Sequence, residues 1–395
     1  MPRSVEKDYY IWRLLSQKNT TKQEARNIIL EANRLNKKLR ESYRKKTGLI
    51  AQKPKARAPR KGLKSKVDWK KRSKAHKHFK HGLALLNQGK AKQASGYFDV
   101  ARRSYSKRYD VDKSLFWLYM STKNKIYLNA LRKSCNINIY TLMAADNTNS
   151  RYPKTITESI WKSKASGHNV KDPIHWAKIK DKMYSGTNLD NLASQYKSQE
   201  SIGVYTYLKA KACDHKDAYF PMPYRDAMKG MSKERQALIY AIARQESRFI
   251  PASVSRSFAL GMMQFMPFLI KHIAKQKGEY MDLDMMFDPY KAIEYADYHL
   301  DYLTKYLHHP LFIAYAYNGG IGFTRKHIRS KRNFRTGAYE PYMSMEMMKN
   351  VEAREYGKKV LANYVIYMNK LGVKTRIFPL LKTLATPSAT DKFRK

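Results

Sequence analysis

Residues 241–247 read Ala-Ile-Ala-Arg-Gln-Glu-Ser and end an apolar helical stretch. Ser232 can cap the start of this helix, and Pro251 forbids its continuation. Glu246 is therefore expected at the carboxyl end of a helix, where the helix dipole opposes ionisation of a carboxyl group. Apolar neighbours such as Ile242 would also desolvate it. Both effects raise the pKa of Glu246, as a general acid near neutral pH requires. Taken alone, the same residue could be an ordinary surface glutamate.

The sequence after this stretch predicts further helices with clear ends. They are expected over 267–278, 288–307, 310–319 and about 345–371, and the first three begin at or beside a proline. Nowhere does the chain show a convincing alternating pattern typical of β-strands. We therefore expect an all-α fold.

The amino-terminal half has a looser helical pattern. Residues 5–45 read as helical, with Thr21 as a candidate N-cap. Residues 75–145 predict paired helices with a turn at 88–90, as in an irregular helical solenoid. Residues 146–230 are the least regular part of the chain.

Size and charge limit the class of protein. The chain has 395 residues, enough for two or three domains, and 43% of them are apolar, which argues against a disordered chain. The formal charge of +46 would attract polyanions: nucleic acid, anionic lipid headgroups or the carboxylate-bearing bacterial cell wall. No nucleic-acid-binding motif is recognised, so nucleic acid is not the expected partner. Residues 45–82 are strongly basic, either as a solvated linker or as a contact strip for a polyanion.

Neither metal nor cofactor chemistry is indicated. Cys135 and Cys213 have no metal-site or redox spacing, and we expect small buried thiols or one bridge. No run of 18 apolar residues predicts a transmembrane helix. The first residues show no signal peptide, which indicates either a cytoplasmic protein or a processed form.

Two further motifs accompany the first carboxylate. They are Gly-Met-Met-Gln at 261–264 and Ala-Tyr-Asn-Gly-Gly at 316–320. A two-carboxylate glycosidase would need a second acid nearby, but Glu234 and Glu279 stand in no motif. Glu352 could return to the site only through folding. The local pattern therefore favours a single acid, with help from a 2-acetamido group of a sugar substrate.

These motifs carry a resemblance. Gln-Glu-Ser at 245–247, the 261–264 and 316–320 motifs, and the stretch 352–356 together resemble the catalytic domain of the soluble lytic transglycosylases, the goose-lysozyme-like family that cleaves peptidoglycan. Residues 1–218 more loosely resemble the helical superhelix and linker that precede this domain. Three residues depart from the family pattern: Met262 for Leu, Gly319 for Ala, and Phe258 for Gly.

The resemblance implies a domain order and a mechanism. It implies a helical superhelix segment over 1–150 with a basic linker near 45–75, a helical linker domain over 151–218, and a lysozyme-like catalytic domain over 219–395. Glu246 would protonate the oxygen between N-acetylmuramic acid and N-acetylglucosamine, and then take a proton from the C6 hydroxyl that attacks C1. The product would be a 1,6-anhydromuramyl end.

The resemblance also assigns supporting residues. Gln264 would bind the sugar beside the acid, Tyr317 would orient the reacting sugar, and Ser255 would bond to an acetamido group or to Glu246. Asn318 would mainly fix its turn. The remaining expected residues of the cleft are Met263, as an apolar wall or as plain core, and Glu352 and Tyr356 as a second wall.

Two alternatives remain open. One is a hydrolytic muramidase on the same fold, and the other is a polyanion-binding protein without enzymatic activity. With the leading interpretation we expect peptidoglycan glycan strands as substrate, a periplasmic location, and anionic envelope surfaces or cell-wall synthases as further partners.

Overall fold

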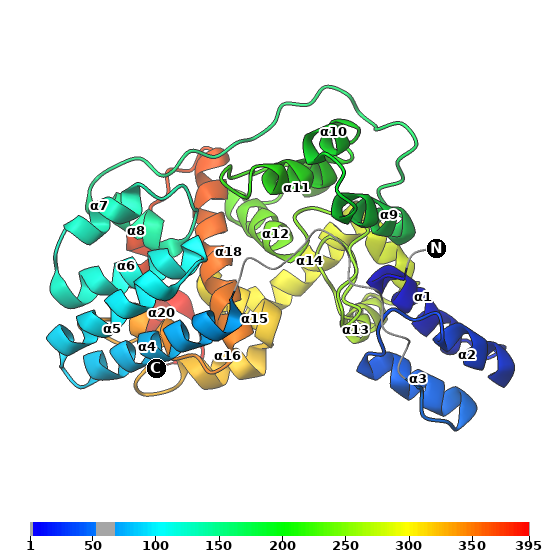
Figure 1. Cartoon of the computed structure of the whole chain (residues 1–395), viewed down its shortest axis with the longest axis horizontal. Coiled ribbons are helices and arrows are strands. Elements are labelled where there is room, and N and C mark those ends of the chain that lie inside the picture. Colours follow the sequence, from blue (N-terminus) through cyan, green and yellow to red (C-terminus); the bar gives the residue numbers. More distant parts are fainter. Residues whose placement is uncertain (1–2, 53–67, 395) are drawn as a thin grey trace.

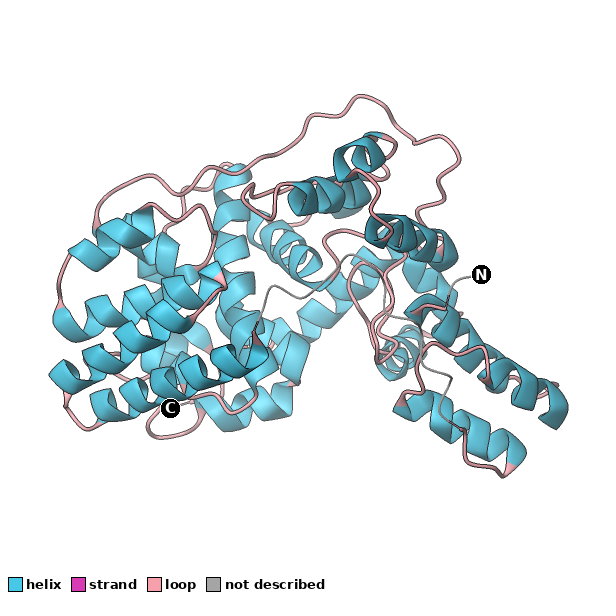
Figure 2. Ribbon diagram, viewed as in Figure 1, coloured by secondary structure: helices cyan, strands magenta, loops and turns pink. Residues whose placement is uncertain are grey.

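The computed structural model describes residues 3–52 and 68–394. Within these ranges the regular elements are twenty α-helices and two short 3-10 helices, and β-pairing is limited to isolated bridges (Figure 2). The expected all-α fold is confirmed. None of the helices in the described ranges is long and apolar enough to cross a membrane.

The first three helices form a small group at one end of the molecule (Figure 1). They are α1 (Val5–Leu15), α2 (Lys22–Ile29) and α3 (Lys37–Thr47), and they pack on one another and on α9 (Pro173–Tyr184). Thr21 caps α2 in a capping box with Glu24, as its position predicted. A second cap at Asn36 starts α3, so residues 5–45 are three helices rather than one continuous helical stretch.

A stack of five helices lies at the opposite end (Figure 1). It comprises α4 (Trp69–Asn87), α5 (Ala91–Ser104), α6 (Arg108–Thr122), α7 (Ile126–Arg132) and α8 (Ile139–Asn147). Consecutive members pack side by side, and residues 88–90 form the predicted turn. The 1–150 segment thus forms two separate groups of helices, at opposite ends of the molecule. Residues 53–67, the centre of the expected basic linker, lie outside the described residues.

An extended segment leads from this stack to α9, α10 (Leu189–Ser194) and α11 (Ile202–Ala212). Residues 151–165 are not helical, and within them the backbone of Ile156 bonds to Ala218 and Phe220 in a short parallel bridge. Helices α9–α11 share a small core of their own around Trp176 and Leu208. The domain limits at 150 and 218 remain a prediction.

The carboxyl-terminal half surrounds the long helix α18 (Val351–Lys370), which packs against α12 (Lys233–Glu246) and α15 (Pro310–Gly319). Ser232, Asp288 and Asn350 cap α12, α14 and α18. The expected start of the last helix near residue 345 was wrong, because 342–346 form a separate short helix. The other elements are η1 (Asp226–Met228), α13 (Pro267–Lys277), η2 (Leu283–Phe287), α14 (Pro289–Thr304), α16 (Ile321–Ile328), α17 (Tyr342–Glu346), α19 (Ile377–Thr383) and α20 (Pro387–Thr390).

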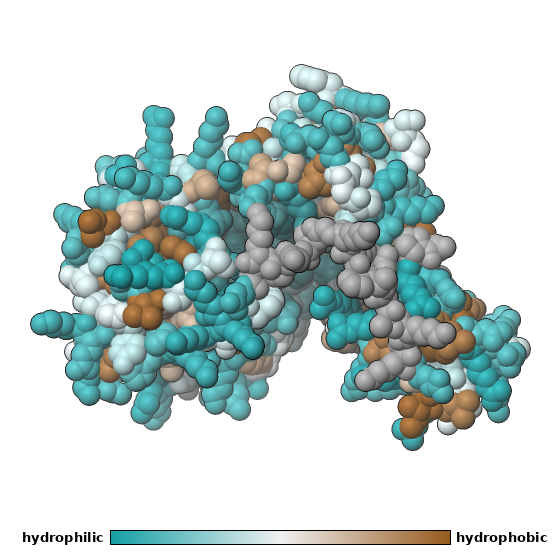
Figure 3. Space-filling view, viewed as in Figure 1, coloured by the Kyte–Doolittle hydropathy of each residue, from teal (hydrophilic) through white to brown (hydrophobic). Residues whose placement is uncertain are grey.

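The surface is polar, as the high charge requires. Hydrophilic side chains cover most of the face in Figure 3, with scattered apolar patches. Cys135 is exposed and Cys213 is half-buried, and both are free thiols. The expectation of buried or bridged cysteines was therefore wrong for Cys135, which lies in the turn between α7 and α8.

Candidate active site

The acid of the first motif stands where helix α12 ends. Ser247 is the C-cap, and the next two residues, Arg248 and Phe249, both have positive φ, so the chain turns away sharply. The hydroxyl of Ser247 fixes this turn, because it donates to the carbonyl of Met262 at 2.8 Å and accepts from the amide of Ile250 at 3.2 Å. Gln-Glu-Ser therefore ends the helix and ties it to the second motif.

Six of the eight expected site residues line one cleft of about 970 Å³. It lies beside the carboxyl ends of α12 and α15, the start of α18 and the 255–266 segment. A seventh residue, Tyr356, reaches the acid from α18. The six are Glu246, Ser255, Gln264, Tyr317, Asn318 and Glu352.

Burial controls the charge of the acid. Glu246 is only partly exposed to the cleft, and protein atoms enclose its other sides. Chiefly through this desolvation, and with a smaller contribution from the negative charge of Glu352, the pKa of Glu246 is raised to about 8. One interaction opposes the shift: the Tyr356 hydroxyl donates to Glu246 Oε1 at 2.9 Å and so favours the ionised form. At neutral pH the carboxyl group is therefore mainly protonated.

The second motif is a tight turn that only glycine allows. Gly261 has a φ of +76°, and a Cβ placed there would lie 2.0 Å from the carbonyl oxygen of Met286. The Gln264 amide nitrogen donates to the carbonyls of Ser253, at 3.1 Å, and Gly261, at 2.8 Å. Among the described residues no donor bonds to its side-chain oxygen, which leaves that oxygen for a ligand.

The third motif brings a tyrosine into the cleft. The Tyr317 hydroxyl donates to the carbonyl of Met263 at 3.0 Å, and its ring packs against Phe265 and His299. Burial, together with the nearby charge of Glu246, raises the pKa of Tyr317 well above its usual value, so the phenol stays neutral. The Met263 side chain is fully buried, so it is core rather than a wall of the cleft.

Phe258 determines how the loop that carries Ser255 lies. The Ser255 hydroxyl accepts from the amide of Ala259 at 2.9 Å and so closes the loop. Phe258 adopts a φ of +61° and is completely buried, with its ring 5.9 Å from that of Tyr9 and 5.6 Å from that of Trp12. A side chain where the family commonly has glycine thus anchors this wall of the cleft to helix α1.

Gly319, which also departs from the family pattern, has a packing reason as well. A Cβ on Gly319 would lie 3.0 Å from the Phe323 ring and 3.3 Å from the Ala353 side chain. The glycine therefore lets α15 end close against α18.

Comparison with known proteins supports the resemblance. Residues 224–339 match the family model described as "Transglycosylase SLT domain". This part of the chain is therefore similar to the transglycosylase SLT domain family. The family model ends before Glu352 and Tyr356, which helix α18 adds to the cleft.

The chain is also similar to two soluble lytic murein transglycosylases. The soluble lytic murein transglycosylase of Salmonella typhimurium is 27% identical over 226 residues, which covers 50% of this chain and 34% of that protein. The Escherichia coli K12 protein of the same name is 29% identical over 179 residues, covering 44% and 27%. The chain thus spans about a third or less of each relative.

A solved structure shows that the fold likeness extends beyond residues 224–339. The lytic transglycosylase Slt of Pseudomonas aeruginosa, in an inactive variant, superposes with a TM-score of 0.52 at 18% identity, covering 94% of this chain and 60% of that one. This likeness concerns the fold alone.

The sequence alone did not indicate one side of the cleft that contains Glu246. His299 and Tyr302 on α14, and Phe268 on α13, form an aromatic side of it. His299 lies on the apolar face of its helix, and the helical period alone cannot distinguish a core position from a cleft wall. Burial lowers the pKa of His299 to about 4, so the ring is neutral at pH 7.

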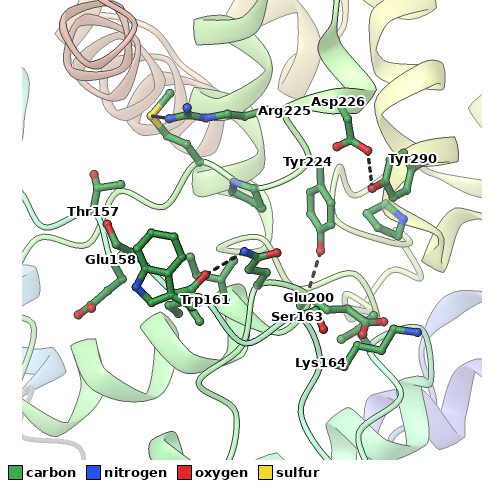
Figure 4. A pocket seen from close by; sticks show the side chains of 18 of the residues that line it. Thr157, Glu158, Trp161, Ser163, Lys164, Glu200, Tyr224, Arg225, Asp226 and Tyr290 are labelled. Atoms are coloured by element: carbon green, nitrogen blue, oxygen red, sulfur yellow. Dashed lines mark hydrogen bonds between the residues drawn. The ribbon is translucent and has the colours of Figure 1, made fainter.

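Another cavity, of about 870 Å³, lies at the amino-terminal end of α14 (Figure 4). It is lined by the extended 157–164 segment and by Glu200, Tyr224 and Tyr290. The Tyr290 hydroxyl donates to Asp226 at 2.9 Å, and Trp161 is 90% exposed at the rim. This cavity contains none of the motif residues, so we assign the candidate site to the cleft with Glu246.

Proposed function

We propose that this chain is a peptidoglycan lytic transglycosylase. It cleaves the β-1,4 bond from N-acetylmuramic acid to N-acetylglucosamine and leaves a 1,6-anhydromuramyl end. The observation that carries this proposal is a single enclosed carboxyl group, Glu246, with a pKa raised to about 8 in a cleft of about 970 Å³. A protonated acid at neutral pH is what cleavage of a glycosidic bond needs first.

The reaction uses that carboxyl group twice. In the first step the proton of Glu246 passes to the oxygen of the glycosidic bond, the bond from C1 to that oxygen breaks, and the acetamido group of the sugar supports the positive charge at C1. In the second step the Glu246 carboxylate takes the proton of the C6 hydroxyl, and the bond between that oxygen and C1 forms. Water is not consumed, and Glu246 is protonated again for the next cycle.

Neighbouring residues have separate tasks in this proposal. The Tyr356 hydroxyl, 2.9 Å from Glu246 Oε1, stabilises the carboxylate formed after the first step. The free side-chain oxygen of Gln264 and the hydroxyl of Ser255 can receive the amide and hydroxyl groups of the sugar. Tyr317 supplies an aromatic wall, and Asn318 holds the end of α15 beside it.

A hydrolytic muramidase is the second candidate, because Glu352 lines the same cleft. It is the only other carboxylate among the described lining residues. If it positioned a water molecule, that water would replace the C6 hydroxyl in the second step.

Digestion of purified peptidoglycan by the whole chain tests the proposal. Glu246→Gln should lower the rate by about 100-fold or more, the scale of general acid catalysis. Glu352→Gln is the matched control: it should retain most of the activity in a transglycosylase and lose it in a hydrolase that depends on that residue for water. Full activity of Glu246→Gln would refute the role of Glu246 in both enzyme candidates. Absence of digestion by the unmodified chain would leave a polyanion-binding protein.

The location and charge fit the same substrate. We propose a periplasmic protein that stays on anionic envelope surfaces, because its formal charge of +46 favours carboxylates and phosphates. Binding to isolated cell-wall sacculi should weaken with added salt. Salt-independent binding would refute this electrostatic explanation, and cell-wall synthases remain candidate partners.

A further inference from the structure

A cation-rich cavity lies on another face of the two helices that form the cleft. It measures about 420 Å³ and is bounded by α4, α6, α12, α18 and the 135–137 and 215–218 turns. It is lined by Arg244 on α12 and by Arg248 just after that helix, whereas Glu246 between them lines the cleft. On α18 it is lined by Lys359, whereas Tyr356 points to Glu246. The proposed chemistry does not use this cavity.

Some of its cations have protein partners. Arg72 forms an ion pair with Asp110 at 2.9 Å, and Arg354 forms one with Glu355 at 3.0 Å. Arg244 donates to the Asn363 side chain at 2.7 Å. Lys113, which also lines the cavity, lies 3.9 Å from Asp110. The charges or donors of these four groups are already used.

Three other cations have no carboxylate partner in the described parts of the chain. They are Lys107 at the start of α6, Arg248 after α12, and Lys359 on α18. The ammonium groups of Lys107 and Lys359 lie over the rings of Trp69 and Tyr109. The segment 53–67 contains no Asp or Glu, so it cannot neutralise them.

The acids of the cavity do not balance these three charges. Asp110 is paired with Arg72, and Glu355 is bonded by Tyr109, Arg354 and Lys358. Only Asp217, exposed at the rim, remains as a lining acid without an ion pair among the described residues. The single exposed carboxylate of Asp217 therefore leaves the three positive charges largely unbalanced.

The cations lie within one another's electric fields. Desolvation lowers the pKa of Lys359, the negative charge of Glu355 raises it, and the positive charges of Arg248 and Lys107 lower it. Burial and Arg248 likewise lower the pKa of Arg244, to about 9. Such repulsion costs stability in the empty cavity and would be relieved by a bound anion.

We propose that this cavity binds a phosphate group. Lys107, Arg248 and Lys359 come from three separate segments, and the oxygens of a tetrahedral phosphate can accept hydrogen bonds from several directions at once. A planar carboxylate has only two oxygens in one plane. The amides of Asn136 and Gln245, which also line the cavity, supply further donors for a bound phosphate.

Isothermal titration of the full chain tests this site directly and needs no enzymatic activity. Inorganic phosphate should bind more tightly than malonate at equal ionic strength. Lys359→Gln should weaken phosphate binding about 10-fold, the scale of one charge-assisted hydrogen bond. Lys92→Gln removes one exposed charge outside the cavity and should change it less than about 2-fold. Equal weakening by the two variants, or preference for malonate, would overturn the proposal.

Thermal unfolding gives a second readout that a folding defect would not mimic. Without phosphate, Lys359→Gln should unfold at a higher temperature than the unmodified protein, because it removes a repelled charge. The stabilisation by added phosphate should shrink in the same variant. A variant that lost stability with and without phosphate would contradict the assignment. Binding of glucose 6-phosphate as well as inorganic phosphate would support a phosphorylated ligand, and binding of inorganic phosphate alone would support free phosphate.

Discussion

Replacement of Tyr356 by phenylalanine should move the pH dependence of cleavage upward. The Tyr356 hydroxyl donates to Glu246 Oε1 at 2.9 Å, and this hydrogen bond lowers the pKa of Glu246, which burial nevertheless raises to about 8. A hydrogen bond to a charged group contributes about 1.5–3 kcal/mol. Since one pKa unit corresponds to about 1.4 kcal/mol, its loss corresponds to about 1–2 pH units.

The direction follows from the role of the acid. Glu246 must be protonated to donate, so activity falls as the pH rises through its pKa. The hydroxyl of Tyr356 favours the carboxylate, and without it the carboxyl group stays protonated to higher pH. The alkaline limb of the pH profile should therefore move to higher pH in Tyr356→Phe, even if the maximal rate decreases.

The assay is kcat/KM for peptidoglycan cleavage as a function of pH, which reports the free enzyme. Tyr317→Phe is the matched control: its hydroxyl donates to the Met263 carbonyl rather than to Glu246, so the alkaline limb should stay in place. An unchanged limb in Tyr356→Phe, or a limb at lower pH, would refute the assignment of that limb to Glu246.

Three further changes test burial and packing. Glu246→Gln should stabilise the protein increasingly as the pH rises from 4.5 towards 8, by up to about 1.4 kcal/mol per pH unit. The reason is that between these values the unfolded chain has released the proton of Glu246 and the folded protein has not. Denaturant unfolding at several pH values measures this difference in stability, and a pH-independent difference would contradict the prediction. Gly261→Ala should cost at least about 2 kcal/mol in the same measurement, since its Cβ would meet the Met286 carbonyl, and a neutral effect would show that the turn can relax. Phe258→Ala should lower the free energy of unfolding by about 3–5 kcal/mol. It should also raise KM more than it lowers kcat, because the loop with Ser255 loses its contact with Trp12. Unchanged stability would contradict the packing of Phe258.

Local chemistry explains what could be predicted from the sequence. Ser232 and Asp288 start their helices as expected, because a capping side chain bonds to amides within three residues of itself. Gly278 and Gly320 end helices for equally local reasons. The motifs at 261–264 and 316–320 fall on turns whose shape depends on their own glycines. Such features need no knowledge of the rest of the fold.

Long-range contacts explain what could not be predicted. Tyr356 meets Glu246 across 110 positions, and no local pattern gives that distance. Phe258 packs on Tyr9 and Trp12, almost 250 residues earlier, so an unexpected residue in a loop gains its meaning only from the fold. Met263 was expected at the cleft or in the core, and only the packing shows that it is core.

Cleavage of purified peptidoglycan in water labelled with oxygen-18, followed by mass spectrometry of the products, tests the central claim most directly. If Glu246 acts twice and the C6 hydroxyl attacks C1, the new muramyl ends are anhydro ends, lighter than reducing ends by one water and free of the label. New reducing ends that carry oxygen-18 would show that water attacks C1, and would contradict the account.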